Sequence, residues 1–138
     1  MNSVKAKIMS SDEALLPLAS SLADAKGWDA FTRTLMLAGK SLEPLSLDKR
    51  TEKTVVEGCE SPVWLAYSDE QDSLMAYSPS KVIRGVLAVL LEKANALTAQ
   101  QRSEFDFEQY LSRCQLERYL SQSRGNGIKS VISKLKCI

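Results

Sequence analysis

Histidine is absent from this chain of 138 residues, and no other feature of its composition excludes as much chemistry. Ser-His-Asp and Cys-His catalysis both need an imidazole to carry the proton. Imidazole is also the commonest metal ligand in proteins. Acid–base chemistry near neutral pH would therefore fall to a perturbed carboxylate, lysine, cysteine or tyrosine. The lack of histidine is a handicap for an enzyme of this size, but it does not hinder a protein that carries a chemical group.

Cysteine is scarce as well, with three residues at positions 59, 114 and 137 and no C-x-x-C pair. A zinc site needs more ligands at closer spacing, so we expect no metal site. An odd number of widely spaced cysteines does not indicate a disulfide framework. We therefore expect a reducing compartment, and the cytoplasm is the default.

Neither a charge surplus nor a long apolar run is present. The chain has 18 basic and 17 acidic residues, which argues against nucleic acid or an anionic membrane as the main partner. The longest apolar run, Val86 to Leu91, is far too short to span a bilayer. Lys5 and Lys7 precede an apolar stretch in the manner of a signal peptide, but Pro17 interrupts that stretch. We expect no signal peptide and a cytoplasmic protein.

The hydrophobic pattern predicts one domain over residues 1–138, of the α+β class, with a small antiparallel sheet and helices packed on one face. Ser78 is expected to cap the central helix, with Pro79 at its first helical position. Residues 121–127 are expected to break the chain before the last helix. The predicted helices are one within Ser11 to Ala25, then Trp28 to Leu42, Pro79 to Ala94, Asp106 to Tyr119, and one carrying Ile128 to Leu135; the predicted strands are Thr54 to Val56, Pro62 to Tyr67 and Ser73 to Tyr77.

Position along the chain separates the three cysteines. Cys114 lies on the apolar face of a predicted helix, where a free cysteine behaves as a small buried hydrophobe. Cys137 is the penultimate residue, and we expect it to be exposed. Cys59 lies in a predicted turn, beside a glycine and shortly before a proline, where a thiol can approach another protein. Its neighbours Glu57 and Glu60 oppose a thiolate, so position alone leaves open whether Cys59 is reactive or merely tolerated in a turn.

The segment around Cys59 resembles the V-x-G-C-x-S-x-V-W-L segment of the SufE family of cysteine desulfurase sulfur acceptors; here it reads VEGCESPVWL from Val56 to Leu65. Three more segments agree in order and spacing. They are Trp28 with LAGK at 37–40, similar to W…LGK-x-L; VIRGVLAVLL at 82–91, similar to I-V-R-G-L-L-A-V-L-L; and LSQSRGNGI at 120–128, similar to L-S-x-S-R-x-N-G-L. The resemblance covers about residues 20 to 136. The chain departs from the family at Tyr77, where the family has an aspartate, and at Pro62, where it has a polar residue.

This resemblance implies an accessory sulfur-transfer protein with a SufE/IscU-like fold and no cofactor of its own. Its partner would be a pyridoxal-phosphate-dependent cysteine desulfurase of the SufS or CsdA type. Cys59 would take a persulfide sulfur from that enzyme, stimulate it, and pass the sulfur on to an iron–sulfur cluster scaffold. The residues expected to support Cys59 or to contact the partner are Gly58, Trp64, Arg84, Arg124 and Asn126.

Each supporting residue also has a structural interpretation. Gly58 eases the turn because glycine accepts backbone angles that other residues avoid. Trp64 fits the core better than a contact surface, as most large aromatic residues do. Arg84 is expected to be a solvated or interface charge. Arg124 either bonds the carbonyls that end the preceding helix or acts near Cys59, and Asn126 shapes the break before the last helix.

Other functions stay open at this point. A stand-alone thiol enzyme, such as a thiol peroxidase or a rhodanese-like sulfurtransferase, is disfavoured by the missing histidine and the acidic neighbours of Cys59. A pure interaction module with an incidental cysteine is the third possibility. Within the family, the helix at 82–91 is closer to the CsdE type and Ser61 to the SufE type, which leaves the choice of desulfurase undecided.

Overall fold

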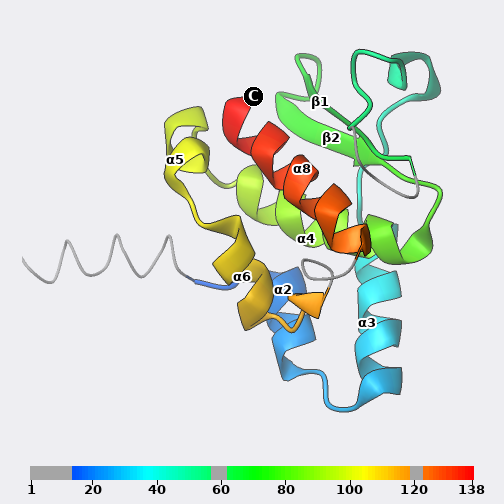
Figure 1. The fold of residues 1–138 in the computed structure, drawn as a ribbon, viewed down its shortest axis with the longest axis vertical. Helices are drawn as coiled ribbons and strands as arrows, with labels where there is room; N and C mark the ends of the chain where they lie inside the picture. The colour runs from blue at the N-terminus through cyan, green and yellow to red at the C-terminus, as the bar shows by residue number, and fades with distance from the viewer. Residues whose placement is uncertain (1–13, 57–61, 119–122) are drawn as a thin grey trace, which may run out of the picture.

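The computed structural model describes residues 14–56, 62–118 and 123–138, with side chains from Gly127 onward in the last range. It confirms the predicted α+β class, with helices around a small antiparallel sheet (Figure 1). The described elements are α2 (Pro17–Asp24), α3 (Trp28–Lys40), the 3-10 helix η1 (Leu47–Lys49), β1 (Trp64–Ser68), β2 (Ser73–Tyr77), α4 (Lys81–Ala94), α5 (Ala99–Glu104), α6 (Phe107–Arg113) and α8 (Ser123–Cys137). No helix in the described ranges has the length and apolar character needed to cross a membrane.

The sheet is an antiparallel hairpin in which Trp64 pairs with Tyr77 and Ser68 pairs with Ser73. The prediction of β2 is confirmed, and β1 begins two residues later than expected. The predicted strand at 54–56 is wrong: it is a single bridge between Val55 and Trp64. No longer strand forms here because the chain bends in the preceding turn, where the Thr54 hydroxyl donates a hydrogen bond to the carbonyl of Lys49.

The two faces of the hairpin differ in what covers them. Leu65, Leu74 and Ala76 are buried and turn toward α4, the central helix of the core. Trp64 and Tyr77 lie on the opposite face and are half-buried. Tyr67 lies on the same face as Leu65 but is 43% exposed, because it lies near the hairpin turn, where its hydroxyl donates a hydrogen bond to Asp72. The inward face therefore builds the core, and the outward face is free to build a site.

Helices α3 and α4 approach each other backbone to backbone. A Cβ added to Gly85 of α4 would lie 2.3 Å from the carbonyl oxygen of Leu35 in α3. A Cβ added to Gly39 would lie 3.0 Å from the amide nitrogen of Gly85. Only glycine leaves room for this crossing, which fixes how the side chains of the two helices meet on the surface.

The face of α3 on which apolar residues recur every three or four positions is mostly buried, as Phe31, Leu35 and Ala38 show. Trp28 is the exception, with 57% of its surface exposed. It lies at the start of α3, and the guanidinium carbon of Arg118 lies 4.2 Å from the centroid of its ring. An arginine over a tryptophan face is a favourable cation–π contact, which stabilises the ring at the surface.

The start of α4 corrects the predicted cap. The N-cap is Ser80, whose hydroxyl accepts a hydrogen bond from the Ile83 amide at 3.3 Å. Ser78 is fully buried and lies before the helix, where its hydroxyl accepts a bond from the Ser80 amide. Pro79 therefore precedes the helix, and α4 begins at Lys81.

Three features of the C-terminal half were mispredicted. Helix α5 was missed, although Thr98 and Gln101 form a capping box that the sequence displays. Helix α6 ends at Arg113 because Gln115 takes a left-handed backbone, with φ of 65°, and its side-chain amide donates to carbonyls at the end of α2. The predicted break at 121–127 is wrong from position 123 onward, since α8 already begins at Ser123.

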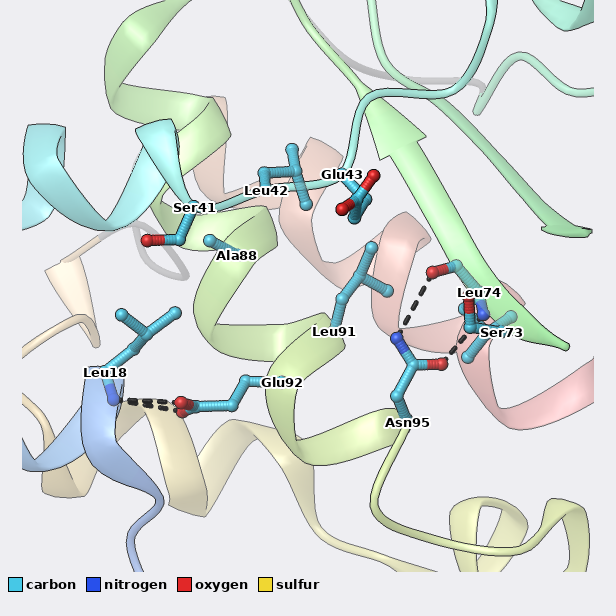
Figure 2. Close-up of a pocket in the computed structure, with 10 residues that line it drawn as sticks. All are labelled: Leu18, Ser41, Leu42, Glu43, Ser73, Leu74, Ala88, Leu91, Glu92 and Asn95. Carbon is cyan, nitrogen blue, oxygen red and sulfur yellow. Dashed lines mark hydrogen bonds between the residues drawn. The ribbon is translucent and has the colours of Figure 1, made fainter. Parts of the chain in front are cut away.

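A pocket of about 400 Å³ lies beside α4, and two side chains of this region that line it bond neighbouring elements (Figure 2). Both carboxylate oxygens of Glu92 accept a bond from the Leu18 amide, at 3.0 and 3.1 Å, near the start of α2. The side chain of Asn95 bonds both the amide and the carbonyl of Leu74 in β2, at 2.7 and 3.2 Å. These polar groups are already used to hold the fold together, so we assign this pocket a structural role.

Candidate functional site

The segment that carries Cys59 is framed by a short stretch of backbone pairing. Gly58 and Cys59 themselves lie outside the described residues. On either side, the Val56 amide donates to the carbonyl of Val63 at 2.7 Å, and the Leu65 amide donates to that of Thr54 at 2.8 Å. Both valines are buried. The chain therefore leaves and rejoins the sheet at paired, anchored positions, which fixes where the Cys59 segment starts and ends.

Helix α8 is tied to the same frame. The Lys134 amine donates a hydrogen bond to the Thr54 carbonyl at 3.1 Å, and burial lowers the pKa of this lysine. The first turns of α8 contain Arg124 and Asn126, whose side chains lie outside the described part of the chain. Asn126 thus belongs to a helix and not to a break. The roles expected of Arg124 stay predictions.

Beside this frame, two aromatic rings and two arginines form a cluster that we call the aromatic platform: Trp64, Tyr77, Arg50 and Arg84. The Trp64 and Tyr77 rings stack with centroids 6.3 Å apart. The guanidinium carbon of Arg50 lies 3.6 Å from the Tyr77 ring centroid, and that of Arg84 lies 5.8 Å from it. All four side chains are half-buried. Trp64 was predicted to lie in the core, but its side chain is only half-buried.

The two arginines of the platform are positioned differently. Arg50 is held by a hydrogen bond from its Nε to the Leu45 carbonyl at 2.7 Å. The Nε of Arg84 is buried and has no acceptor within the described ranges. Arg84 was predicted as a solvated or interface charge; it is half-buried and lies at the edge of the platform.

The platform places positive charge near the base of the Cys59 segment. Guanidinium groups stay charged at every physiological pH, and nearby cations favour a thiolate over a thiol. Trp64, which pairs directly with Val55, links the platform to the frame. The sequence alone showed only the acidic neighbours of Cys59 at positions 57 and 60, and the platform adds two cationic side chains beside the frame.

Sequence reasoning missed Arg50 and Tyr77 as site residues. The expected strand bounds, 62–67 and 73–77, would have paired Trp64 with Ala76, whereas the observed register pairs Trp64 with Tyr77. Nothing in the pattern around Arg50 indicates its position, since it follows the short helix η1 in a polar loop. Its contact with Tyr77 exists only because that loop crosses the outward face of the sheet.

The other two thiols lie where the sequence predicts. Cys114 is fully buried and its Sγ donates to the Leu111 carbonyl at 3.4 Å. Burial raises the pKa of Cys114 to about 12, so it is a thiol at neutral pH and cannot act as a nucleophile. Cys137 is exposed at the end of α8.

Alkaline pH is expected to destabilise the fold through two buried acids. Burial raises the pKa of Cys114 from 9.0, and that of Tyr110 from 10.0, to about 12. At a pH between the pKa of such a group in the unfolded chain and its pKa in the folded chain, the unfolded chain has lost the proton and the folded chain still holds it. Stability therefore falls as pH rises above about 9, by up to about 1.4 kcal/mol per pH unit and group.

Urea titrations between pH 8 and pH 11 measure this loss. The variant Cys114→Ala is the matched test, because it removes the group that titrates first. Its free energy of unfolding is lower at pH 8, from the lost packing, but should then stay flat up to about pH 10, where Tyr110 begins to act. An equally steep decline in the variant and the wild type between pH 9 and pH 10 would contradict the assignment to Cys114.

Comparison with known proteins decides the family. The family model described as "SufE: Fe-S metabolism associated domain" matches residues 17–138. The chain belongs to the SufE family. The match extends from the start of α2 to the end of α8 and includes both the frame around Cys59 and the aromatic platform. Membership connects the protein with iron–sulfur metabolism.

Three similar proteins are themselves named only as SufE-like. An uncharacterized SufE-like protein of Haemophilus influenzae is 27% identical over 118 residues, which cover 83% of this chain and 94% of that protein. Uncharacterized SufE-like proteins of Rhizobium etli and Rhizobium meliloti are 29% and 30% identical over 115 residues, 79% of this chain in both cases and 78% and 82% of the relatives. These overlaps, about four fifths of this chain, agree with the family match over residues 17–138.

Proposed function

We propose that this SufE-family protein is a sulfur acceptor that takes a persulfide sulfur from a pyridoxal-phosphate-dependent cysteine desulfurase onto Cys59. It thereby stimulates the desulfurase and then passes the sulfur on for iron–sulfur cluster assembly. It acts as an accessory protein in the cytoplasm and holds no cofactor. A desulfurase and a downstream scaffold are its partners; neither nucleic acid nor a membrane is needed.

The transfer is an exchange between sulfur atoms. The Cys59 thiolate attacks the terminal sulfur of the desulfurase persulfide and forms a new S–S bond. The existing S–S bond breaks, and its electron pair leaves with the desulfurase cysteine as a thiolate. The proton lost by Cys59 balances the one that the desulfurase cysteine can regain. No external oxidant or reductant enters, which suits a chain without histidine.

One observation carries this proposal: two guanidinium groups stack around Tyr77, next to the anchored base of the segment that holds Cys59. Positive charge at this position favours the thiolate that the exchange needs. The buried alternative, Cys114, has its pKa raised to about 12 and cannot serve. The anchored frame also lets the segment enter a partner's site without disturbing the core, because both of its ends are paired to backbone.

The direct test is to find the transferred sulfur. The protein is incubated with a purified cysteine desulfurase from the same genome and free cysteine, then alkylated and digested. Mass spectrometry should find one extra sulfur atom on the peptide that contains Cys59, and none on the peptides that contain Cys114 or Cys137. Running the assay with SufS-type and CsdA-type desulfurases separately identifies the partner. Extra sulfur on Cys137 instead would contradict the proposal.

A stand-alone thiol enzyme is the alternative function. A thiol peroxidase or a rhodanese-like sulfurtransferase would turn over peroxide or thiosulfate without any partner protein. The same preparation can be assayed with each substrate in the absence of desulfurase. Sustained turnover of either substrate, together with no stimulation of the desulfurase, would show that the protein is a stand-alone thiol enzyme and not a sulfur acceptor.

A further inference from the structure

A second surface feature lies between α3 and α4, away from the pocket in Figure 2. It is a pocket of about 290 Å³ whose lining includes four cationic side chains, Arg33 and Lys40 from α3 with Lys81 and Arg84 from α4. No residue that lines it, within the described chain, is acidic. We call this the basic groove. Such a concentration is notable because basic and acidic residues are almost balanced over the whole chain.

The floor of the basic groove explains why the cations gather there. Gly39 and Gly85 let the backbones of α3 and α4 touch, so the long side chains on both sides of the crossing share one hollow. Like charges held together in this way repel each other, and nothing in the lining offsets that repulsion. A bound anionic group would offset it, which gives the groove an electrostatic preference for an acidic ligand.

Apolar surface runs along the same groove. Met36 is 39% exposed and Leu37 is 55% exposed, and both line it. Exposed large apolar residues beside charges are typical of protein interfaces, which combine apolar anchors with a polar rim. The lining contains no aromatic ring on which a nucleic-acid base could stack. The composition therefore favours a peptide segment with acidic and apolar side chains over an RNA or DNA strand.

The groove is also continuous with the site. Arg84 lines the groove and belongs to the aromatic platform, where its guanidinium carbon lies 5.8 Å from the Tyr77 ring centroid. A partner chain seated in the groove would thus reach toward the base of the Cys59 segment. This continuity connects the occupant of the groove with the protein that exchanges sulfur with Cys59.

We infer that the basic groove binds an acidic, amphipathic surface segment of the cysteine desulfurase, and so docks the enzyme beside Cys59. This inference rests on the proposed function. The groove supplies affinity and leaves the sulfur exchange to Cys59. Apart from Arg84, which the groove shares with the platform, docking and chemistry depend on separate residues, which makes them separable by mutation.

Charge reversal in the groove tests the docking. The double variant Arg33→Glu with Lys40→Glu should bind the purified desulfurase about tenfold more weakly or worse, because attraction becomes repulsion. Its maximal stimulation at saturating concentration should match the wild type, since neither residue belongs to the platform. The control, Lys26→Glu with Lys136→Glu, makes the same change in charge outside the groove and should bind within about twofold of the wild type.

A photo-crosslinking amino acid at Leu37 identifies the occupant. It should capture an acidic segment of the purified desulfurase, whereas the same probe at the exposed Gln100 of α5 should not. A crosslink to a second copy of this chain would overturn the inference. So would binding of a labelled single-stranded RNA that the double variant loses.

The outcomes separate the docking from the proposed function. If Cys59 receives the sulfur but the double variant Arg33→Glu with Lys40→Glu binds the desulfurase as the wild type does, only the docking role of the groove is overturned. Groove-dependent desulfurase binding without sulfur on Cys59 overturns the acceptor function alone. A wild-type protein that neither binds nor stimulates any desulfurase overturns both.

Discussion

Replacing Cys59 with serine is expected to abolish desulfurase stimulation completely, leaving only the unaided rate of the enzyme. A serine hydroxyl is not ionised at neutral pH and cannot attack a persulfide sulfur as a thiolate does. The loss should persist at any concentration of the variant, because docking through the basic groove cannot replace the nucleophile. Sulfide release from free cysteine, measured with a purified desulfurase, gives the effect directly.

Two controls accompany this variant. Cys137→Ser, at an exposed position, should stimulate as the wild type does. Cys59→Ser should unfold at the same temperature as the wild type, because the flanking pairs of Val56 with Val63 and of Thr54 with Leu65 remain. Full stimulation by Cys59→Ser would make the protein a pure interaction module. Loss with Cys137→Ser instead would move the nucleophile to the end of α8.

Replacing Gly85 with alanine is expected to be the most destabilising conservative change that the structure identifies. In the interior of a helix, glycine to alanine normally stabilises by about 0.5–1 kcal/mol. Here the added Cβ would lie 2.3 Å from the Leu35 carbonyl oxygen, a backbone atom that cannot rotate away. The helices must separate, and overpacking of this kind costs about 3 kcal/mol. The midpoint temperature of thermal unfolding should fall by roughly 10 °C.

Two other glycines give this prediction its controls. A Cβ on Gly27 meets nothing within 4 Å, but the backbone there has φ of 85°, so alanine costs only the strain of about 1–2 kcal/mol. A Cβ on Gly39 would lie 3.0 Å from Gly85, a tight contact that relaxes with a smaller shift. Gly85→Ala is therefore expected to lose much more stability than Gly27→Ala or Gly39→Ala. A stabilised Gly85→Ala protein would contradict the close crossing of α3 and α4.

Much of the secondary structure could be predicted because its signals are local. The strand at 73–77 alternates buried and half-buried residues, and the apolar run of α4 needs a core on most sides. One error arose where distant residues decide: Gln115 ends α6 by bonding the end of α2, a contact that no local pattern carries. Other errors lie at local signals, namely the turn stabilised by Thr54, which limits the expected strand to one bridge, and the capping box of Thr98 and Gln101 that begins α5.

The sequence by itself determined which thiol is the candidate and which family the chain resembles. Residue type, order and spacing suffice for that, because Cys59, the missing histidine and the four matching segments are all linear features. The family match over residues 17–138 then confirmed the resemblance. The sequence also indicated that Cys114 would be buried, since its position on an apolar helical face is periodic information.

Only the tertiary structure decided what surrounds the Cys59 segment. Arg50 and Arg84 are 34 residues apart in the sequence, and both reach Tyr77 because a loop and the start of α4 meet on one face of the hairpin. The basic groove likewise exists because Gly39 and Gly85 bring two helices into contact. Charge acts through space and not along the chain, so the two arginines beside the frame became visible only once the chain was folded.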